Sequence, residues 1–110
     1  MKSLRNPKRR PTHPGAILRE DVLPALGMTQ TEFAQLLGVS RLSVSELLHE
    51  KRSLSPEMAV RVARLLRTTP ESWMRMQVAV TLWELAQTGI LAEVEPLTKK
   101  RLEANEAEAA

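Results

Sequence analysis

Apolar residues recur with a helical period on both sides of Gly38, over residues 29–49 of this 110-residue chain. Each of the two expected helices has one apolar face, made of Phe33, Ala34 and Leu37 in the first and of Val44, Leu47 and Leu48 in the second. Only about three or four residues separate the helices, which suits a near-right-angle crossing better than an antiparallel hairpin. The pattern therefore predicts a helix-turn-helix.

Cap residues mark the ends of both helices. Thr29 is followed three residues later by Glu32, the pattern of a capping box, so the first helix is expected to begin after Thr29. Gly38 is expected to end it, because glycine adopts the left-handed conformation of a C-terminal cap without steric cost. Ser40 is then expected to cap the second helix.

The second helix turns mostly small or polar side chains outward. They are Ser40, Arg41, Leu42, Ser45, Glu46 and His49. A helix face that only meets water usually carries more Lys and Glu and fewer serines. We therefore interpret this face as one that binds DNA, rather than as part of a plain helical hairpin.

Three further helices are expected around this pair, which predicts an all-α, five-helix bundle. The first helix begins at Pro14 and is expected to end or kink near Leu23, because Pro24 follows. Its buried face is expected to consist of Ile17, Leu18 and Val22, joined by Leu26 beyond them. The last two helices are expected to begin at Ser55-Pro56 and Thr69-Pro70, where a capping residue precedes a proline at the first helical position.

The fourth helix is amphipathic, with Ala59, Val62, Ala63 and Leu66 expected inside and Arg61, Arg64 and Arg67 outside. The fifth helix runs to about Gln87 and has two apolar stripes, Trp73, Met76, Val80 and Trp83 in one and Val78, Leu82, Leu85 and Ala86 in the other. A helix that is apolar on two sides is buried on two sides. In a chain this small the second contact is most simply another protomer.

We assign Trp73, Val80 and Trp83 to a homodimer interface, the alternative being that the tryptophans fill the core of a single chain. A dimer would place two recognition helices roughly 34 Å apart on palindromic DNA.

The two ends of the chain differ from the domain expected at residues 12–87. Residues 1–11 hold five basic residues and no acidic one. They are expected to form a flexible arm, which is either a solubilising tail or a segment that reaches DNA. In the C-terminal tail, residues 88–110, loose alternation over Ile90–Leu97 allows a short strand. Thr98–Leu102 allows a turn of helix, and residues 103–110 are expected to be frayed.

Basic residues concentrate in the half of the chain that contains the helix-turn-helix. Residues 1–52 hold nine basic and five acidic residues, a net charge of +4, whereas residues 93–110 hold three and five, a net charge of −2. Lys51 and Arg52 follow the second helix directly. Two adjacent cations at this place suit contact with DNA phosphates, and a merely solvated loop is the alternative.

Composition argues against several other classes of protein. The chain has no cysteine, which fits a reducing cytoplasm and leaves no disulfide or thiolate metal site. No stretch has the pattern of a signal peptide or a membrane span. Two isolated histidines, and serines without a neighbouring base, favour neither an enzyme nor a metal or cofactor site. His13 is expected to be a cap or packing residue.

Short motifs between Thr12 and Gln87 carry a family resemblance. They are His13-Pro14-Gly15, Gly38-Val39-Ser40, Ser45-Glu46-Leu47-Leu48, Lys51-Arg52, Leu54-Ser55-Pro56-Glu57-Met58-Ala59 and Thr69-Pro70-Glu71-Ser72-Trp73. Together they resemble the HigA-type antitoxins, which belong to the phage-repressor-like (XRE/Cro) helix-turn-helix class. The resemblance implies a bacterial homodimer that neutralises a HigB-like toxin, a small RelE-fold ribonuclease. It also implies repression of the protein's own operon at a palindromic operator.

The resemblance assigns DNA contacts to two groups of residues. Base readout falls to Ser40, Arg41, Leu42 and Ser45, and contacts with the DNA backbone fall to Thr29, Gln30, Ser43, Lys51 and Arg52. Arg41 is expected to read a guanine through O6 and N7. Glu46 either accepts from a cytosine amino group or braces Arg41, and we prefer the brace.

This chain departs from the family pattern at two places. Ala16 stands where many relatives have Glu, and Leu42-Ser43 stands where Gln-Thr is common. Leu42 has no hydrogen-bonding group, so its expected contact is a thymine methyl, and the operator sequence should differ from that of relatives.

Other functions share some of these features. A stand-alone repressor would have the same DNA-binding residues and no toxin partner, and an inhibitor with a degenerate helix-turn-helix would not bind an operator. A basic toxin would be attracted to acidic residues such as Glu20-Asp21 or Glu93–Glu95.

Overall fold

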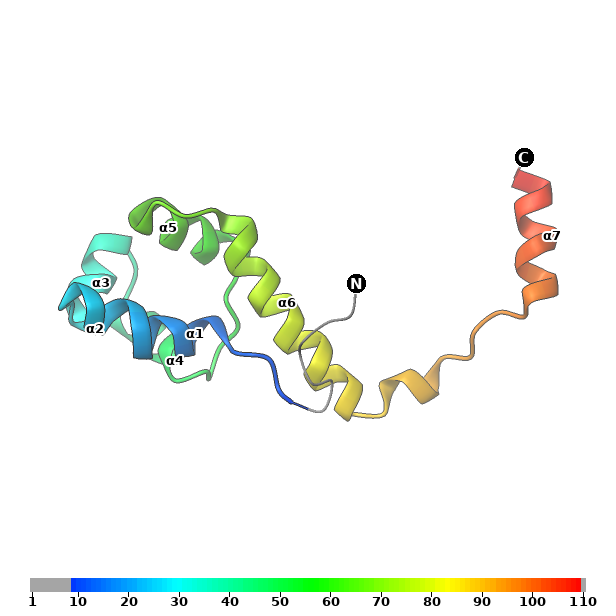
Figure 1. Cartoon of the computed structure of the whole chain (residues 1–110), viewed down its shortest axis with the longest axis horizontal. Coiled ribbons are helices and arrows are strands. Elements are labelled where there is room, and N and C mark those ends of the chain that lie inside the picture. The colour runs from blue at the N-terminus through cyan, green and yellow to red at the C-terminus, as the bar shows by residue number, and fades with distance from the viewer. Residues whose placement is uncertain (1–8, 110) are drawn as a thin grey trace.

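The N-terminal helix runs through a proline without ending (Figure 1). In the computed structural model, which describes residues 9–109, it comprises α1 (Pro14–Ile17), the π-helical turn η1 (Leu18–Val22) and α2 (Leu23–Leu26). Pro24 was expected to end or kink the helix near Leu23, and an end at that position is wrong. The helix ends at Gly27, whose φ of 61° is the left-handed conformation of a C-terminal cap.

The π turn explains why the helix survives its proline. The N–H of Leu23 donates to the carbonyl of Leu18, five residues back instead of four. This wider turn directly precedes Pro24, which has no N–H to donate. The irregularity that a proline imposes is thus contained within the helix.

The two helices of the predicted helix-turn-helix are α3 (Gln30–Leu37) and α4 (Arg41–Leu48), and their predicted caps are confirmed. The Thr29 hydroxyl accepts from the N–H of Glu32 at 3.1 Å, and the Ser40 hydroxyl accepts from the N–H of Ser43 at 3.1 Å. Gly38, with a φ of 72°, ends α3. Local sequence therefore determines where these helices begin and end.

The last two helices of the bundle are α5 (Pro56–Leu66) and α6 (Pro70–Gln87). Both have the predicted N-caps: Ser55 accepts from Met58 at 3.1 Å, and Thr69 accepts from Ser72 at 3.3 Å. The helix α6 packs on α5 and continues beyond the bundle (Figure 1).

Apolar side chains from every helix of the bundle form one core. Its fully buried members include Leu18, Phe33, Val44, Leu47, Leu48 and Val62, with Leu54 in the loop before α5. The apolar faces predicted for the helix-turn-helix are all inside, whereas Leu66 of α5 is only half-buried. The expectation that Leu26 is buried is wrong: it is 54% exposed in the last turn before Gly27. The all-α bundle is confirmed.

In the C-terminal tail, the strand that the pattern allowed and the expected frayed end are both wrong, whereas the turn of helix allowed at Thr98–Leu102 is confirmed by a helix that begins at Lys99. A 3₁₀ turn, η2 (Ile90–Glu93), replaces the strand, and α7 (Lys99–Ala109) replaces the frayed end; residue 110 lies outside the described residues. Alanine and glutamate dominate the end of α7, and both are good helix formers. Figure 1 places α7 away from the bundle. Over residues 9–109, no helix is both long and apolar enough to span a membrane.

Candidate nucleic-acid interface

The outward face of α4 presents a cation and an apolar side chain side by side. Arg41 and Leu42, at the start of the helix, are exposed, and Leu42 is 67% accessible. Ser40 is exposed beside them, although its hydroxyl is engaged with Ser43. The Arg41 and Leu42 side chains are therefore accessible at the start of α4, the part of the second helix that meets base edges in helix-turn-helix proteins.

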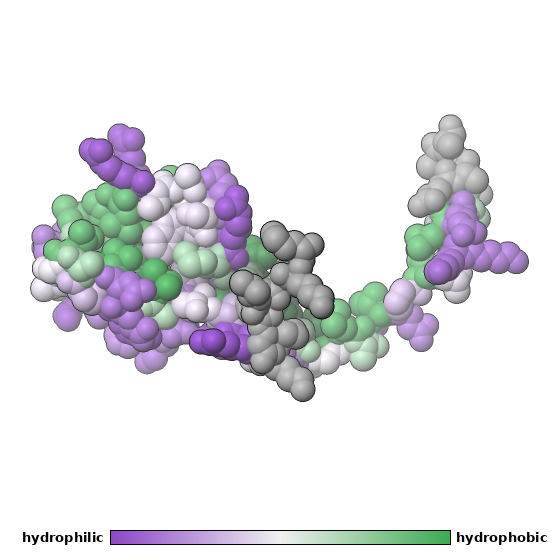
Figure 2. Space-filling model, in the orientation of Figure 1, coloured by the Kyte–Doolittle hydropathy of each residue, from purple (hydrophilic) through white to green (hydrophobic). Residues whose placement is uncertain are grey.

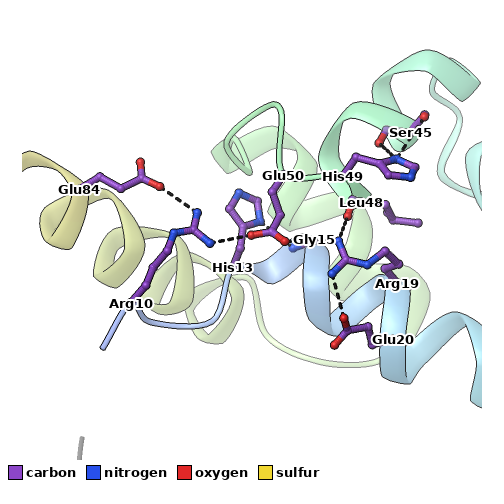
Figure 3. A network of polar contacts seen from close by, with 10 residues as sticks. All are labelled: Arg10, His13, Gly15, Arg19, Glu20, Ser45, Leu48, His49, Glu50 and Glu84. Atoms are coloured by element: carbon purple, nitrogen blue, oxygen red, sulfur yellow. Dashed lines mark hydrogen bonds and ion pairs between the residues drawn. The ribbon is translucent and has the colours of Figure 1, made fainter. Parts of the chain in front are cut away.

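Further along α4, Ser45 is half-buried and its carbonyl accepts a hydrogen bond. The donor is His49 Nδ1, which lies 2.7 Å from this carbonyl oxygen (Figure 3). Because a carbonyl oxygen can only accept, His49 Nδ1 must carry the proton. This bond fixes the imidazole against the last turn of α4 and leaves Nε2 as the ring's other polar atom.

Arg52 is held against α4 by two side chains. Its Nη1 donates to the Ser43 hydroxyl at 3.2 Å, and its Nη2 donates to the Glu46 carboxylate at 3.4 Å. The preferred expectation that Glu46 braces Arg41 is wrong: Glu46 braces Arg52, because the loop after α4 returns along the side of the helix that carries Glu46. We call Ser43, Glu46 and Arg52 the Arg52 clasp.

The start of α3 contributes the other predicted backbone contacts. Thr29 is exposed and Gln30 is half-buried. Both line a surface depression of about 420 Å³, together with Arg19 and Met28. The free N–H groups of the first helical turn lie here, and such groups attract anions such as phosphate.

A network of charges holds the loop that carries Lys51 and Arg52. Glu50 opens this loop in the left-handed conformation, with a φ of 61°. Its carboxylate binds Arg10 at 2.7 Å and Arg19 at 3.3 Å, and Arg19 also donates to the Leu48 carbonyl at 2.5 Å (Figure 3). The hydrogen bond from Arg10 is the main reason that the pKa of Glu50 is lowered. The loop is therefore anchored from two sides.

Arg10 joins this network to α6, because its second nitrogen binds Glu84 at 2.9 Å. The sequence analysis placed Arg10 and Pro11 in a flexible arm, but Arg10 is ion-paired and Pro11 is buried. Residues 1–8 of that arm lie outside the described part of the chain.

His13 is a cap, as predicted. Its Nδ1 accepts from the N–H of Gly15 at 2.9 Å, so this nitrogen carries no proton. Burial lowers the pKa of His13, which is 4% exposed, against the opposing effect of Glu50. The ring is neutral at the start of α1. No cluster of three or more potential metal ligands occurs among residues for which side chains are described.

Two supporting residues were missed by the sequence analysis. Arg61, expected outside, donates to the Leu37 carbonyl at 2.8 Å and so closes the end of α3 next to the turn. Gln77 is 5% exposed, and its side chain accepts from the N–H of Leu54 at 2.8 Å. A polar residue within an apolar helix face was the available signal for Gln77. Nothing in the sequence indicates the partner of Arg61.

The residues assigned to a dimer interface do not share one environment. Trp73 is 5% exposed and packs in the core with its indole bonded to Thr68 at 2.7 Å, and Val80 is 1% exposed. Both are buried within a single chain, which was the alternative weighed for the tryptophans. Trp83 is half-buried, and no described residue accepts from its buried Nε1. The exposed stripe of α6 is the other one, with Val78, Leu82 and Leu85.

Comparison with known proteins agrees with this geometry. The chain matches the helix-turn-helix family over residues 18–73. The uncharacterized HTH-type transcriptional regulator YbaQ of Escherichia coli (strain K12) is 46% identical over 77 residues, which is 70% of this chain and 68% of the relative. The antitoxin HigA-1 of Vibrio cholerae is 37% identical over 81 residues, 74% of this chain and 76% of the relative.

A solved structure of Pseudomonas aeruginosa antitoxin HigA with the higBA promoter is also similar. It has 34% sequence identity and a TM-score of 0.75, and the match covers 81% of this chain and 100% of that one.

Proposed function

Because this chain belongs to the helix-turn-helix family and resembles the HigA-type antitoxins within it, we propose that it represses its own operon and neutralises a partner toxin. The names of its relatives are those of regulators and antitoxins, not of enzymes. In this proposal, the residues of the candidate nucleic-acid interface described above make the contacts with operator DNA.

One observation carries the proposal: the outward face of α4 lies beside a loop in which the Arg52 side chain is held by Ser43 and Glu46. Arg41 and Leu42 are exposed at the start of α4, where a recognition helix contacts base edges. Lys51 and Arg52 flank the helix, and the Arg52 clasp fixes the guanidinium before DNA arrives. Preorganised cations lose less conformational entropy on binding phosphate.

Operator binding tests this half of the proposal. Fluorescence anisotropy with a duplex from upstream of the gene should show tighter binding than with a shuffled duplex. The affinity should fall linearly on a log–log plot against salt, because phosphate contacts release counterions. Equal affinity for both duplexes at every salt concentration would remove the proposal of a specific operator.

We assign dimerisation to the exposed face of α6 rather than to Trp73 and Val80. Val78 and Leu82 are 47% and 61% exposed, on a helix that extends beyond the bundle. Adjacent exposed apolar side chains favour contact with another protein. Sedimentation velocity should give a dimer for the wild type, and Leu82→Asp should yield monomers. A wild type that stays monomeric at all concentrations would exclude this interface.

The toxin half is tested by co-expression with the neighbouring open reading frame. A stoichiometric complex with a small basic protein that is toxic alone is the expected result. A dimer that binds its promoter without such a partner would instead indicate a stand-alone regulator, the name under which YbaQ appears.

Charge reversal locates the toxin contact. Glu20 and Asp21 are exposed on η1, and Glu93 and Glu95 are exposed after α6. Replacing one pair at a time by lysine should weaken the complex at the pair that faces the toxin. Unchanged affinity in both variants would exclude an acidic contact at these places.

A further inference from the structure

A shallow groove runs along α6 from Glu71 to Leu82. Its volume is about 570 Å³, and its lining is Glu71, Met74, Arg75, Val78, Ala79 and Leu82. Most of these side chains are apolar, and we call the depression the α6 groove. Over the described residues it is open to solvent, so a monomer leaves it unfilled.

The chain carries a second exposed apolar surface immediately after α6. Within residues 88–97, which we call the exit segment, the large apolar side chains are exposed: Ile90 42%, Leu91 74%, Val94 71% and Leu97 53%. Figure 2 shows these hydrophobic side chains along the link between α6 and α7. Two adjacent apolar surfaces on a chain of this size are more than a stable monomer usually exposes.

The charges on the two surfaces are complementary. Arg75 at the rim of the groove is exposed, and the structure gives it no ion pair with a described residue. The exit segment carries Glu93 and Glu95, also exposed and equally without a cation among those residues. The groove lining carries one cation, Arg75, and one anion, Glu71, so the charge match with the acidic, apolar exit segment is local to Arg75.

The exit segment cannot easily reach the groove of its own chain. It leaves from the C-terminal end of α6, whereas the groove lies toward the N-terminal end of that helix, and the segment leads away from the bundle (Figure 1). When two α6 helices cross antiparallel near Leu82 and Leu85, however, the segment that follows one helix lies beside the Met74–Val78 part of the other. A twofold axis then brings each exit segment to the partner's groove.

We propose that the exit segment of one protomer packs into the α6 groove of a second copy of this chain. This exchange rests on the dimer proposed above. It specifies what covers the exposed apolar surfaces: the α6 groove of one protomer binds the exit segment of the other. It buries Leu91 and Val94 against Met74 and Val78 and brings Glu93 or Glu95 to Arg75. Each protomer thereby contributes both its α6 groove and its exit segment to the interface.

The chain has no native cysteine, so disulfide trapping reports on single engineered pairs. Two differently tagged chains, one with Val78→Cys and one with Leu91→Cys, are co-expressed and oxidised. We expect an interchain disulfide between positions 78 and 91, identified by mass spectrometry. Val60→Cys is the matched control, because Val60 is 55% exposed on α5, outside the groove, and should not be trapped by position 91.

The outcomes separate the exchange from the dimer itself. A dimer in sedimentation that yields no 78–91 disulfide overturns the exchange but leaves the dimer. A monomer overturns both. A disulfide that forms only when both cysteines are in one chain shows that the segment folds back on its own helix, and this also overturns the exchange.

A second measurement tests whether the exit segment binds the toxin instead of the α6 groove of a second protomer. Leu91→Asp combined with Val94→Asp should raise the dimer dissociation constant by roughly tenfold or more, since two buried aliphatic contacts are lost. Leu102→Asp on α7, where Leu102 is 45% exposed, should leave it unchanged. Normal dimerisation with weakened toxin binding would overturn the exchange and assign the segment to the toxin.

Discussion

The Arg10 guanidinium lies 2.7 Å from the Glu50 carboxylate, so a residue before the first helix holds the loop that follows the recognition helix. The same guanidinium reaches Glu84 on α6 at 2.9 Å. Two surfaces with different proposed roles, the DNA loop and the dimer helix, thus share one cation. The Arg10 side chain is 39% exposed, so its contribution to folding is moderate and depends on salt.

Replacing Arg10 by Met should lower the free energy of unfolding at pH 7 by about 0.5–1 kcal/mol, the range for partly exposed ion pairs. The pKa of Glu50 is held below its ordinary value of 4.5, mainly by Arg10, so this contribution is complete above pH 4.5. It is lost as the pH falls through the lowered pKa, because Glu50 is then protonated in both states.

Urea unfolding of both proteins should therefore show curves that differ at pH 7 and converge as the pH falls below the lowered pKa of Glu50. Glu84→Gln is the control, since it removes one partner of Arg10 but keeps Glu50. A difference that persists undiminished as the pH is lowered would assign the effect to lost packing rather than to charge.

The helix boundaries could be predicted because the signals are local. Ser55 and Thr69 cap their helices through residues three positions away, and Gly38 acts through its own backbone. The course of the tail could not be predicted in this way. The pattern at Ile90–Leu97 fits a strand, but a strand needs a partner strand, and the described chain offers none.

The residues of the candidate site also fall into those that local signals predict and those that they do not. The exposure of Arg41, Leu42 and Lys51 could be predicted from the helical period and from the position of the loop. All three side chains are exposed in the structure. The partner of Arg52 and the anchor of Glu50 depend on residues distant in sequence or on the exact path of a loop. Sequence period carries no information about either, so the Arg52 clasp and the role of Arg10 emerged only from the structure.

His13 should make the stability of the fold depend on pH. Its pKa is lowered from the ordinary 6.5 by burial, with Arg10 acting in the same direction and Glu50 and Glu84 opposing. Between the lowered pKa and 6.5 the unfolded chain binds a proton that the folded chain does not, so stability falls as the pH falls below 6.5. The slope is at most about 1.4 kcal/mol per pH unit for one proton.

His13→Asn keeps an acceptor for the N–H of Gly15 and removes the titration. Thermal unfolding between pH 5 and pH 7 should be flatter for this variant than for the wild type. Equal slopes for His13→Asn and wild type would contradict a neutral, buried cap.

Gly15→Ala should be strongly destabilising, because a Cβ at this position would lie 1.9 Å from the carbonyl oxygen of Leu47. The start of α1 and the end of α4 must then separate, and the Leu47 oxygen belongs to backbone that cannot rotate away. We expect a loss of roughly 3 kcal/mol or more in the free energy of unfolding, as for severe overpacking.

Gly27→Ala is the matched control. No atom lies within 4 Å of the Cβ it would add, so only the cost of its positive φ remains, about 1 kcal/mol. Chemical denaturation of the two variants measures the difference. Equal destabilisation would mean that the close approach at Gly15 does not matter.

Gln77→Met should cost about 1–3 kcal/mol, because it leaves the buried N–H of Leu54 without an acceptor while nearly preserving side-chain volume. Gln87→Met is the comparison, since Gln87 is exposed at the end of the same helix and should change stability by less than about 0.5 kcal/mol. Urea unfolding checks both values. A near-neutral Gln77→Met would show that another group or water satisfies Leu54.

Arg41 and Arg52 should affect operator binding in different ways. Arg41 is exposed at the start of α4, and its loss in Arg41→Ala should cost about 1–3 kcal/mol and relax specificity at one base pair. Arg52 is held by Ser43 and Glu46, and its proposed partner is phosphate. Arg52→Ala should weaken binding to all sequences alike and reduce the salt slope by about one.

Anisotropy titrations on the operator and on single-base variants, each at several salt concentrations, distinguish the two roles. Glu46→Gln adds a test of the Arg52 clasp: Arg52 keeps its charge but loses its ionic partner. Its salt slope should equal that of the wild type, with weaker binding, because the guanidinium is no longer held in position. If Arg41→Ala lowers affinity equally for every base variant, Arg41 contacts only the backbone, and another residue of α4 reads the bases.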